Sequence, residues 1–217
     1  MVRALDENPE VGAVYADSLI TTKENETFDR NSAKRYFRRP NYNLRQMMIF
    51  SLFGPHPMWR RSVHETLGYF DPSFEVAGDY DFFIQLAWQF GALHISENLG
   101  LYTQRESSIE NSKRQKCVKE TIQILKHYRK RIPLEEIYPE LSSVSDAKAA
   151  RAACLFDQGS SCLFGDVPDI ENAIRYFQQA FELGMDAPEL SCNLALALYL
   201  DGQRSKGIEL LRQQQQI

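Results

Sequence analysis

The first regular hydrophobic pattern in the chain is an alternation of apolar and small residues over VGAVYAD, residues 11–17. Alternation with a period of two, directly after the turn-forming stretch ENPE, predicts a β-strand. The polar segment that follows, residues 18–41, keeps no such pattern after its first few positions. We therefore expect a long loop there, of the kind that often carries functional residues.

Residues 42–91 contain three predicted helices. YNLRQMMIFSLF predicts a short helix closed by Gly54 and Pro55, and SVHETLG predicts a second, which Ser62 can cap and Gly68 can end. The third, DYDFFIQLAWQFG, is apolar on nearly every side, which is typical of a buried helix. Short extended pieces are expected at HPMWRR, before the second helix, and at ALHIS and LGLYTQ, after the third.

The pattern becomes helical after Ser112. SKRQKCVKETIQILKHYRKR predicts an amphipathic helix stopped by Pro133, and IPLEEIYPELSS, with two prolines, predicts a linker. From about Asp146 the chain is helical to its end. The fold class we expect is α+β followed by all-α helical hairpins, helix-rich overall, in three parts: residues 1–112, a helix and linker over 113–145, and residues 146–217.

The last part contains an internal repeat. NAIRYFQQAFELG and SKGIELLRQQQQ align at a spacing of 34 residues, which places Ala173 with Gly207 and Phe177 with Leu211. A period of 34, two helices per unit and small residues at the crossing position resemble the tetratricopeptide repeat. Two units are fewer than the usual minimum of about three. We therefore expect them to pack against the helix over 113–131 or the first domain.

Composition and charge describe an ordinary globular chain with an uneven charge distribution. Of its 217 residues, 43% are hydrophobic and 25% charged, and the net charge is −4. Residues 30–61 carry eight Lys or Arg and no acid, whereas residues 62–112 carry eight acids and one base, Arg105. The basic segment is either a solvated loop or a site for phosphate groups. Nucleic-acid binding is not expected, because the chain is acidic overall and has no recognised binding motif.

The cysteines and the terminus bear on the compartment. Cys117, Cys154, Cys162 and Cys192 are far apart and form no CxxC pair, so we expect buried thiols in a reducing cytoplasm. No apolar run reaches the ~18 residues of a membrane span, and the N-terminus does not resemble a signal peptide. The histidines have no metal-binding spacing, so no metal ligand is expected on this chain.

Two aspartates, Asp79 and Asp81, stand at the start of the predicted buried helix. An acid at this position stabilises a helix, because it accepts hydrogen bonds from free N–H groups and complements the helix dipole. A carboxylate at a helix start can also remove the proton of an attacking hydroxyl as a general base. Gly78 would let the backbone approach a substrate closely. The spacing alone does not separate these roles.

The surrounding residues resemble a known family. HPMWRRSVHETLGYFDPSFEVAGDYDFFIQLAWQFGALHISENLGLY is similar to the second half of the family-2 glycosyltransferases, which have the GT-A fold. The shared pattern is Trp-Arg-Arg, a short helix ending in Gly-Tyr-Phe-Asp, an acidic pair that opens a Leu- and Trp-rich helix, and two strands. Upstream, LDENPEVGAVYAD resembles the family's helix end and strand after its metal-binding motif. The resemblance covers residues 2–110.

The resemblance implies roles for individual residues. Asp79 matches the family's catalytic base, while Asp81 and the motif residues Trp59, Arg60 and Arg61 match positions that contact substrate. Trp59 has an alternative interpretation as a core residue beside solvated arginines. The chain departs from the commonest pattern at Gly78, where many members have Glu, and at Gln85, where many have Arg.

The same comparison implies that the donor side is absent from this chain. The family holds a divalent ion, Mg or Mn, on the sugar-nucleotide diphosphate with an Asp-x-Asp motif, and no such motif precedes Val2. The sequence DYD at 79–81 has the Asp-x-Asp pattern, but it does not lie where the family has its metal-binding motif. We therefore expect the chain to be the acceptor-side part of a bacterial-type transferase and to be inactive alone, since half of the transition-state contacts are missing.

Two functions follow from these features. The first is a segment of an inverting glycosyltransferase, in which Asp79 activates a hydroxyl on a glycan, lipid-linked or protein acceptor against a nucleotide sugar. The second is a helical-repeat module that binds a protein partner, with the transferase-like part as a non-catalytic scaffold.

Overall fold

The computed structural model describes residues 1–105, 107–108 and 112–214, and it is a helix-rich α+β structure. The chain forms two compact units, Met1–Ile124 and Leu125–Ile217. The boundary falls within a continuous helix, α6 (Arg114–Arg131). Glu106, Glu110 and the last positions of the predicted final helix, 215–217, lie outside the described residues.

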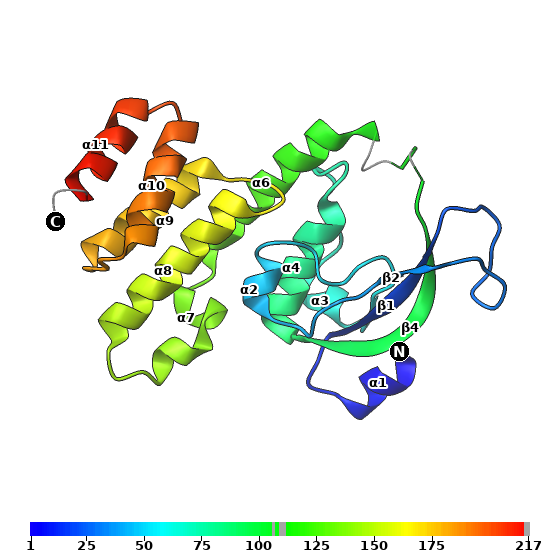
Figure 1. Cartoon of the computed structure of the whole chain (residues 1–217). Helices are drawn as coiled ribbons and strands as arrows, with labels where there is room; N and C mark the ends of the chain where they lie inside the picture. Colours follow the sequence, from blue (N-terminus) through cyan, green and yellow to red (C-terminus); the bar gives the residue numbers. More distant parts are fainter. Residues whose placement is uncertain (106, 109–111, 215–217) are drawn as a thin grey trace. The chain divides into compact units, whose positions relative to one another are not determined.

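The first unit is built on a four-stranded mixed sheet centred on β1 (Ala13–Thr21). β4 (Ala92–Thr103) runs parallel to β1 along its whole length, as Figure 1 shows. β2 (Arg35–Phe37) and β3 (Met58–Trp59) are antiparallel to β1, pairing with its second half and its start. Because β1 has neighbours on both edges and is covered by other elements, its residues 13–18 are all buried.

The strand predicted at 11–17 is confirmed, but two neighbouring expectations are wrong. β1 continues to Thr21 and β2 follows at Arg35, so residues 18–41 are partly sheet. Backbone pairing between strands far apart in sequence stabilises these polar positions, which the side-chain pattern does not reveal. The two strands expected around Glu97 form one strand, β4, in which the register shifts opposite Asp17.

Before α6, the described residues of the first unit contain the helices α1 (Val2–Glu7), α2 (Leu44–Met47), α3 (Val63–Leu67) and α4 (Gly78–Phe90). The side chain of Asn43 caps α2 by accepting from the N–H of Gln46. Ser62 stands at the N-cap of α3 but its side chain makes no capping hydrogen bond, so the expected cap is wrong. Gly68 does end α3, and its φ of 77° is one that glycine adopts without strain.

The helix α4 is buried along most of its length, as its sequence predicted. Gly12 lies directly against its C-terminal end: a Cβ on Gly12 would be 2.5 Å from the Cβ of Phe90. The N–H of Gly12 donates to the carbonyl of Phe90 at 2.9 Å. This close approach fixes the end of α4 beside the start of β1.

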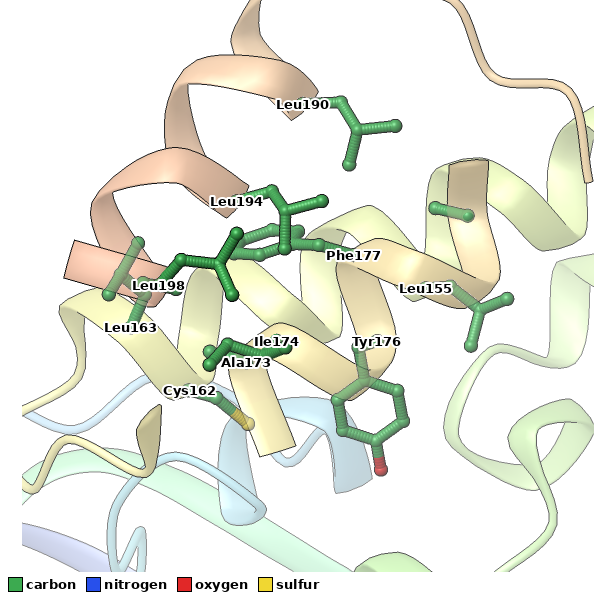
Figure 2. Close-up of a cluster of buried hydrophobic side chains, with 12 residues drawn as sticks. Leu155, Cys162, Leu163, Ala173, Ile174, Tyr176, Phe177, Leu190, Leu194 and Leu198 are labelled. Carbon is green, nitrogen blue, oxygen red and sulfur yellow. The ribbon is translucent and has the colours of Figure 1, made fainter. Parts of the chain in front are cut away.

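The second unit begins inside α6 and is helical. The stretch predicted as a linker contains α7 (Leu134–Ile137) and a 3₁₀ turn, Pro139–Ser142, so that expectation is wrong. Four longer helices follow: α8 (Ala147–Phe164), α9 (Ile170–Glu182), α10 (Pro188–Leu200) and α11 (Arg204–Gln214). Leucines, aromatics and small residues of α8, α9 and α10 form its hydrophobic core (Figure 2).

At two glycines of this unit, neighbouring helices pack closely against each other. A Cβ on Gly159 of α8 would be 2.6 Å from the ring of Phe177, and one on Gly207 of α11 would be 2.8 Å from the carbonyl oxygen of Ala195. Neither distance leaves room for a side chain, so glycine lets the paired helices pack closely. Among the described residues, no helix is long and apolar enough to cross a membrane.

Candidate functional site

Asp79 is the second residue of α4, after the N-cap residue Ala77 and Gly78. Its side chain is exposed, and one carboxylate oxygen accepts the N–H of Tyr80 at 2.8 Å. Desolvation by the surrounding protein raises the pKa of Asp79 above that of an ordinary aspartate, and the Tyr80 N–H only partly offsets this. Asp79 thus contributes to the helix start, as expected, and also presents a carboxylate with an increased proton affinity.

Asp81 is buried, with 8% of its surface exposed, and its Oδ2 accepts from Nε2 of Gln85 at 3.1 Å. Gln85, where many of the family-2 glycosyltransferases that the sequence resembles have Arg, therefore contacts Asp81. Its neighbour Tyr80 is buried too and donates its hydroxyl to the carbonyl of Met47 at 2.6 Å. The two acids consequently have different environments: Asp79 is exposed as a residue while the surrounding protein partly desolvates its carboxyl group, and Asp81 is buried.

Trp59 belongs to an aromatic cluster beside α4. Its Nε1 donates to Nε2 of His64 at 2.9 Å, and its ring lies 5.6 Å from that of Phe82 and 5.8 Å from that of Phe83. Trp59 is half-buried, and its N–H is engaged within the protein.

Tyr69 forms the outer end of a stack of three rings. Its ring is 4.7 Å from His64 with an interplanar angle of 19°, and His64 is 5.2 Å from Phe82 at 21°. His64 also donates from Nδ1 to the carbonyl of Gly68 at 2.7 Å, since its Nε2 accepts from Trp59. The Tyr69 side chain is 82% exposed, so one face of a well-held ring is open to solvent.

The two arginines after Trp59 differ in their surroundings. The Arg60 guanidinium donates to three backbone carbonyls near the N-terminus, those of Leu5, Asn8 and Val11. It therefore holds α1 and the following turn. Arg61 is exposed.

Other arginines of the basic segment also bind the protein itself. Arg38 donates to Oδ2 of Asp17 at 2.9 Å, and the guanidinium of Arg39 lies 3.8 Å over the ring of Phe37. Burial lowers the pKa of Arg39. Arg30, Lys34 and Arg35 are exposed. Part of the segment therefore binds the protein itself, and the rest is exposed to solvent.

A residue that the sequence did not single out, Glu120 of α6, contacts the loop in front of α4. Its carboxylate accepts three backbone N–H groups in a row, those of Glu75, Val76 and Ala77. A glutamate in the middle of an amphipathic helix normally faces solvent. Nothing in the local sequence indicates that this one is 7% exposed and bound to a loop more than 40 residues away.

The divalent ion that the family resemblance associates with the donor half does not fit the residues described here. No group of three or more His, Cys, Asp or Glu within 1–105, 107–108 and 112–214 is arranged to hold a metal. Of the two aspartates of DYD, Asp81 is already bound to Gln85. We therefore assign no metal ligand and derive no step through a metal.

Comparison with known proteins does not assign the chain to a family. No protein-family model matches the chain, and a search of curated proteins also finds no match.

Proposed function

We propose that this chain is the acceptor-side segment of an inverting glycosyltransferase that uses a nucleotide sugar, with Asp79 as general base. The observation that carries the proposal is the difference between the two aspartates: Asp79 is exposed with a raised pKa, while Asp81 is buried. The resemblance of residues 2–110 to family-2 glycosyltransferases supports it. The four cysteines form no disulfide, which is compatible with the cytoplasmic enzyme that we propose, although only Cys154 and Cys162 are the buried thiols that the sequence predicted and Cys192 is exposed.

In this mechanism the Asp79 carboxylate accepts the proton of an acceptor hydroxyl as its oxygen attacks the anomeric carbon. The new bond from oxygen to carbon forms while the bond to the nucleoside diphosphate breaks, and the diphosphate leaves with the electron pair. Inversion follows from this single displacement, and the proton remains on Asp79. A general base works best when its pKa lies near the working pH, so the raised pKa of Asp79 suits this role.

The open face of Tyr69 is the feature best suited to an acceptor sugar. Aromatic faces attract the C–H groups of a pyranose ring, and among the aromatics near α4, Tyr80 and Trp59 are occupied by protein contacts. Phe82, at the inner end of the stack, lies three residues after Asp79, which is slightly less than one helical turn, or about 4.5 Å along the axis. Arg61 is exposed to contact substrate, whereas Arg60 acts in this proposal by holding the segment in place.

The test is a transfer assay with radiolabelled nucleotide sugars, using this chain alone and this chain produced with the reading frame directly upstream of Met1. We expect no turnover by the chain alone. Where transfer is found, Asp79→Asn should reduce it at least ~10²-fold, and the exposed control Glu65→Gln should not change it. Full activity of Asp79→Asn would contradict the proposal.

Stability separates loss of chemistry from loss of folding. An aspartate with a raised folded-state pKa favours folding below its unfolded pKa, and this contribution is lost as the pH rises through the folded value. Removing the charge with Asp79→Asn should therefore leave the melting temperature at neutral pH unchanged or slightly higher. Inactivity with a strongly reduced melting temperature would indicate that Asp79 is only structural.

A second candidate function is a helical-repeat module that binds a partner, favoured by a groove on the last two helices. The groove, of about 260 Å³, lies between α10 and α11 and is walled by Leu196, Tyr199, Ile208 and Leu211. These side chains are 39–49% exposed. Because they lie three positions apart on each helix and form an apolar groove, the occupant that fits is an amphipathic helix with leucines at every third or fourth position.

A fluorescent amphipathic peptide with leucine at every third or fourth position tests this candidate. We expect binding to the chain that is lost in Ile208→Glu and kept in Val144→Glu, whose site is exposed but outside the groove. No binding, or equal binding by both variants, would contradict the module. Concentration-dependent self-association that blocks the peptide would assign the groove to a second copy of the chain instead.

A further inference from the structure

Both carboxylate oxygens of Glu120 bind the loop before α4. Its Oε1 lies 3.0 Å from the N of Glu75, and its Oε2 lies 2.8 Å from the N of Val76 and 2.9 Å from the N of Ala77. One buried carboxylate therefore binds three consecutive backbone N–H groups. A carboxylate that accepts several such bonds makes charge-assisted hydrogen bonds, which are roughly twice as strong as neutral ones.

These three groups lead directly into α4. Ala77 is the N-cap residue, and it has no side-chain oxygen with which to cap the helix. Glu120 brings a negative charge to the same helix end from another element, where the helix dipole favours an anion. The helix that carries Asp79 is thus capped from outside by α6.

A second contact strengthens the attachment of this loop to α6. The carboxylate of Glu75 pairs with the ammonium groups of Lys113 and Lys116, at the start of α6. On the other side, Gly78 faces the carbonyl of Asp71, which would be 3.6 Å from a Cβ at that position. The residue before Asp79 therefore packs against the turn at residues 71–74.

We propose that Glu120 is a positioning residue for Asp79: by fixing residues 75–77 it holds the first turn of α4, and with it the Asp79 carboxylate, in place. The proposal rests on the proposed function only in giving Asp79 a catalytic role. If it is correct, α6 controls the site without touching the substrate. A loosened loop would admit water to the first turn of α4 and change the surroundings of Asp79.

The test follows the Asp79 carboxyl and the loop amides by NMR in Glu120→Gln. A glutamine offers one acceptor oxygen, and its NH₂ group opposes the backbone donors. We expect amide exchange at Val76 and Ala77 to become at least ~10-fold faster, because a local opening becomes easier. The pKa of Asp79 should fall toward the ordinary value, since its desolvation decreases.

Two further variants separate position from charge. Glu75→Gln removes the ion pairs with Lys113 and Lys116 but leaves the three hydrogen bonds to Glu120, so exchange and the Asp79 pKa should change less than in Glu120→Gln. Glu120→Asp keeps the charge but shortens the side chain, and should lower the Asp79 pKa and accelerate exchange as Glu120→Gln does. It also replaces Glu120→Gln if that variant does not fold.

The proposal is overturned if the Glu120 variants leave the Asp79 titration unchanged, or if Glu75→Gln shifts it equally. Reduced global stability with an unchanged Asp79 pKa would show that Glu120 is merely structural. None of these measurements uses turnover. They can therefore overturn the role of Glu120 independently of the glycosyltransferase proposal, which the Asp79→Asn transfer assay tests.

Discussion

The Nε2 atom of His94 lies 2.9 Å from Oδ1 of Asp17, and this contact joins the parallel strands β4 and β1 where their register shifts. Asp17 also accepts from the side chain of Arg38 and from the backbone N–H of Arg39, both at 2.9 Å. Only 2% of Asp17 is exposed. One buried carboxylate therefore connects the two central strands and the segment after β2.

This arrangement predicts a specific acid sensitivity. Burial alone would raise the pKa of Asp17, but the hydrogen bonds from Arg39, Arg38 and His94 outweigh it and hold the pKa below the ordinary value. A depressed folded-state pKa stabilises the fold above the unfolded pKa of about 3.9. This contribution is lost as the pH falls through the folded value.

Urea unfolding of the wild type and Asp17→Asn between pH 7 and pH 2.5 measures that contribution. We expect the variant to be less stable at pH 7 and the difference to shrink below about pH 4. Asp71→Asn is not a suitable control, because the pKa of Asp71 is lowered as well. Glu65→Gln, on the surface of α3, should follow the wild-type curve. A difference independent of pH would contradict the prediction.

The second unit contains a buried ion pair between Arg129 and Asp169, 3.0 Å apart, with both side chains 2% exposed. Asp169 is also the N-cap of α9. Asparagine caps a helix about as well as aspartate, so Asp169→Asn removes the charge and keeps the cap. Since the buried Arg129 then loses the counter-charge of Asp169, we expect a loss of about 3–5 kcal/mol in unfolding free energy.

The exposed N-cap of α8 offers a matched control for that experiment. Asp146 accepts the N–H of Ala149 at 3.0 Å, and it is exposed to solvent. Asp146→Asn should cost less than ~1 kcal/mol, because both residues cap well. Equal losses of unfolding free energy at the two positions, measured by urea unfolding, would show that the buried ion pair does not account for the effect of Asp169→Asn.

The close approach of α10 and α11 predicts that a single methyl group is harmful at Gly207. Alanine normally stabilises a helix interior by ~1 kcal/mol relative to glycine. In Gly207→Ala, however, the new Cβ would meet the carbonyl oxygen of Ala195 at 2.8 Å and force the helices apart. We expect a net loss of about 1–3 kcal/mol. The neighbouring, exposed Lys206→Ala should change the unfolding free energy by less than ~0.5 kcal/mol.

Tyr69 and Tyr80 should separate acceptor binding from stability. Tyr69→Ala should change the unfolding free energy by less than ~0.5 kcal/mol and weaken binding of a pyranoside by about 2–10-fold, the equivalent of an aromatic contact. Tyr80→Phe removes the buried hydrogen bond to Met47, so it should cost ~1 kcal/mol of stability and leave binding unchanged. Saturation-transfer NMR with a panel of methyl pyranosides measures the binding, and unaltered binding by Tyr69→Ala would remove Tyr69 from the acceptor site.

The local patterns in the sequence indicated most of the elements. The apolar run of α4 and the helical pattern of the later segments predict helices, because burial of one helix face needs only the right periodicity. β2 and the continuity of β4 were missed, since a polar strand is stabilised by backbone partners that no local pattern contains. The expected cap at Ser62 failed for a similar reason: the residue type permits a hydrogen bond that the backbone geometry does not form.

For the candidate site, the sequence alone determined that two aspartates open a buried helix, and residue type and periodicity suffice for that. Only the tertiary structure decided how they differ, leaving Asp79 exposed with a raised pKa and burying Asp81 against Gln85. It also assigned Arg60 to backbone carbonyls and Glu120 to the loop before α4. Desolvation and long-range hydrogen bonds depend on which distant segments come together, and this information is absent from the neighbouring residues in the chain.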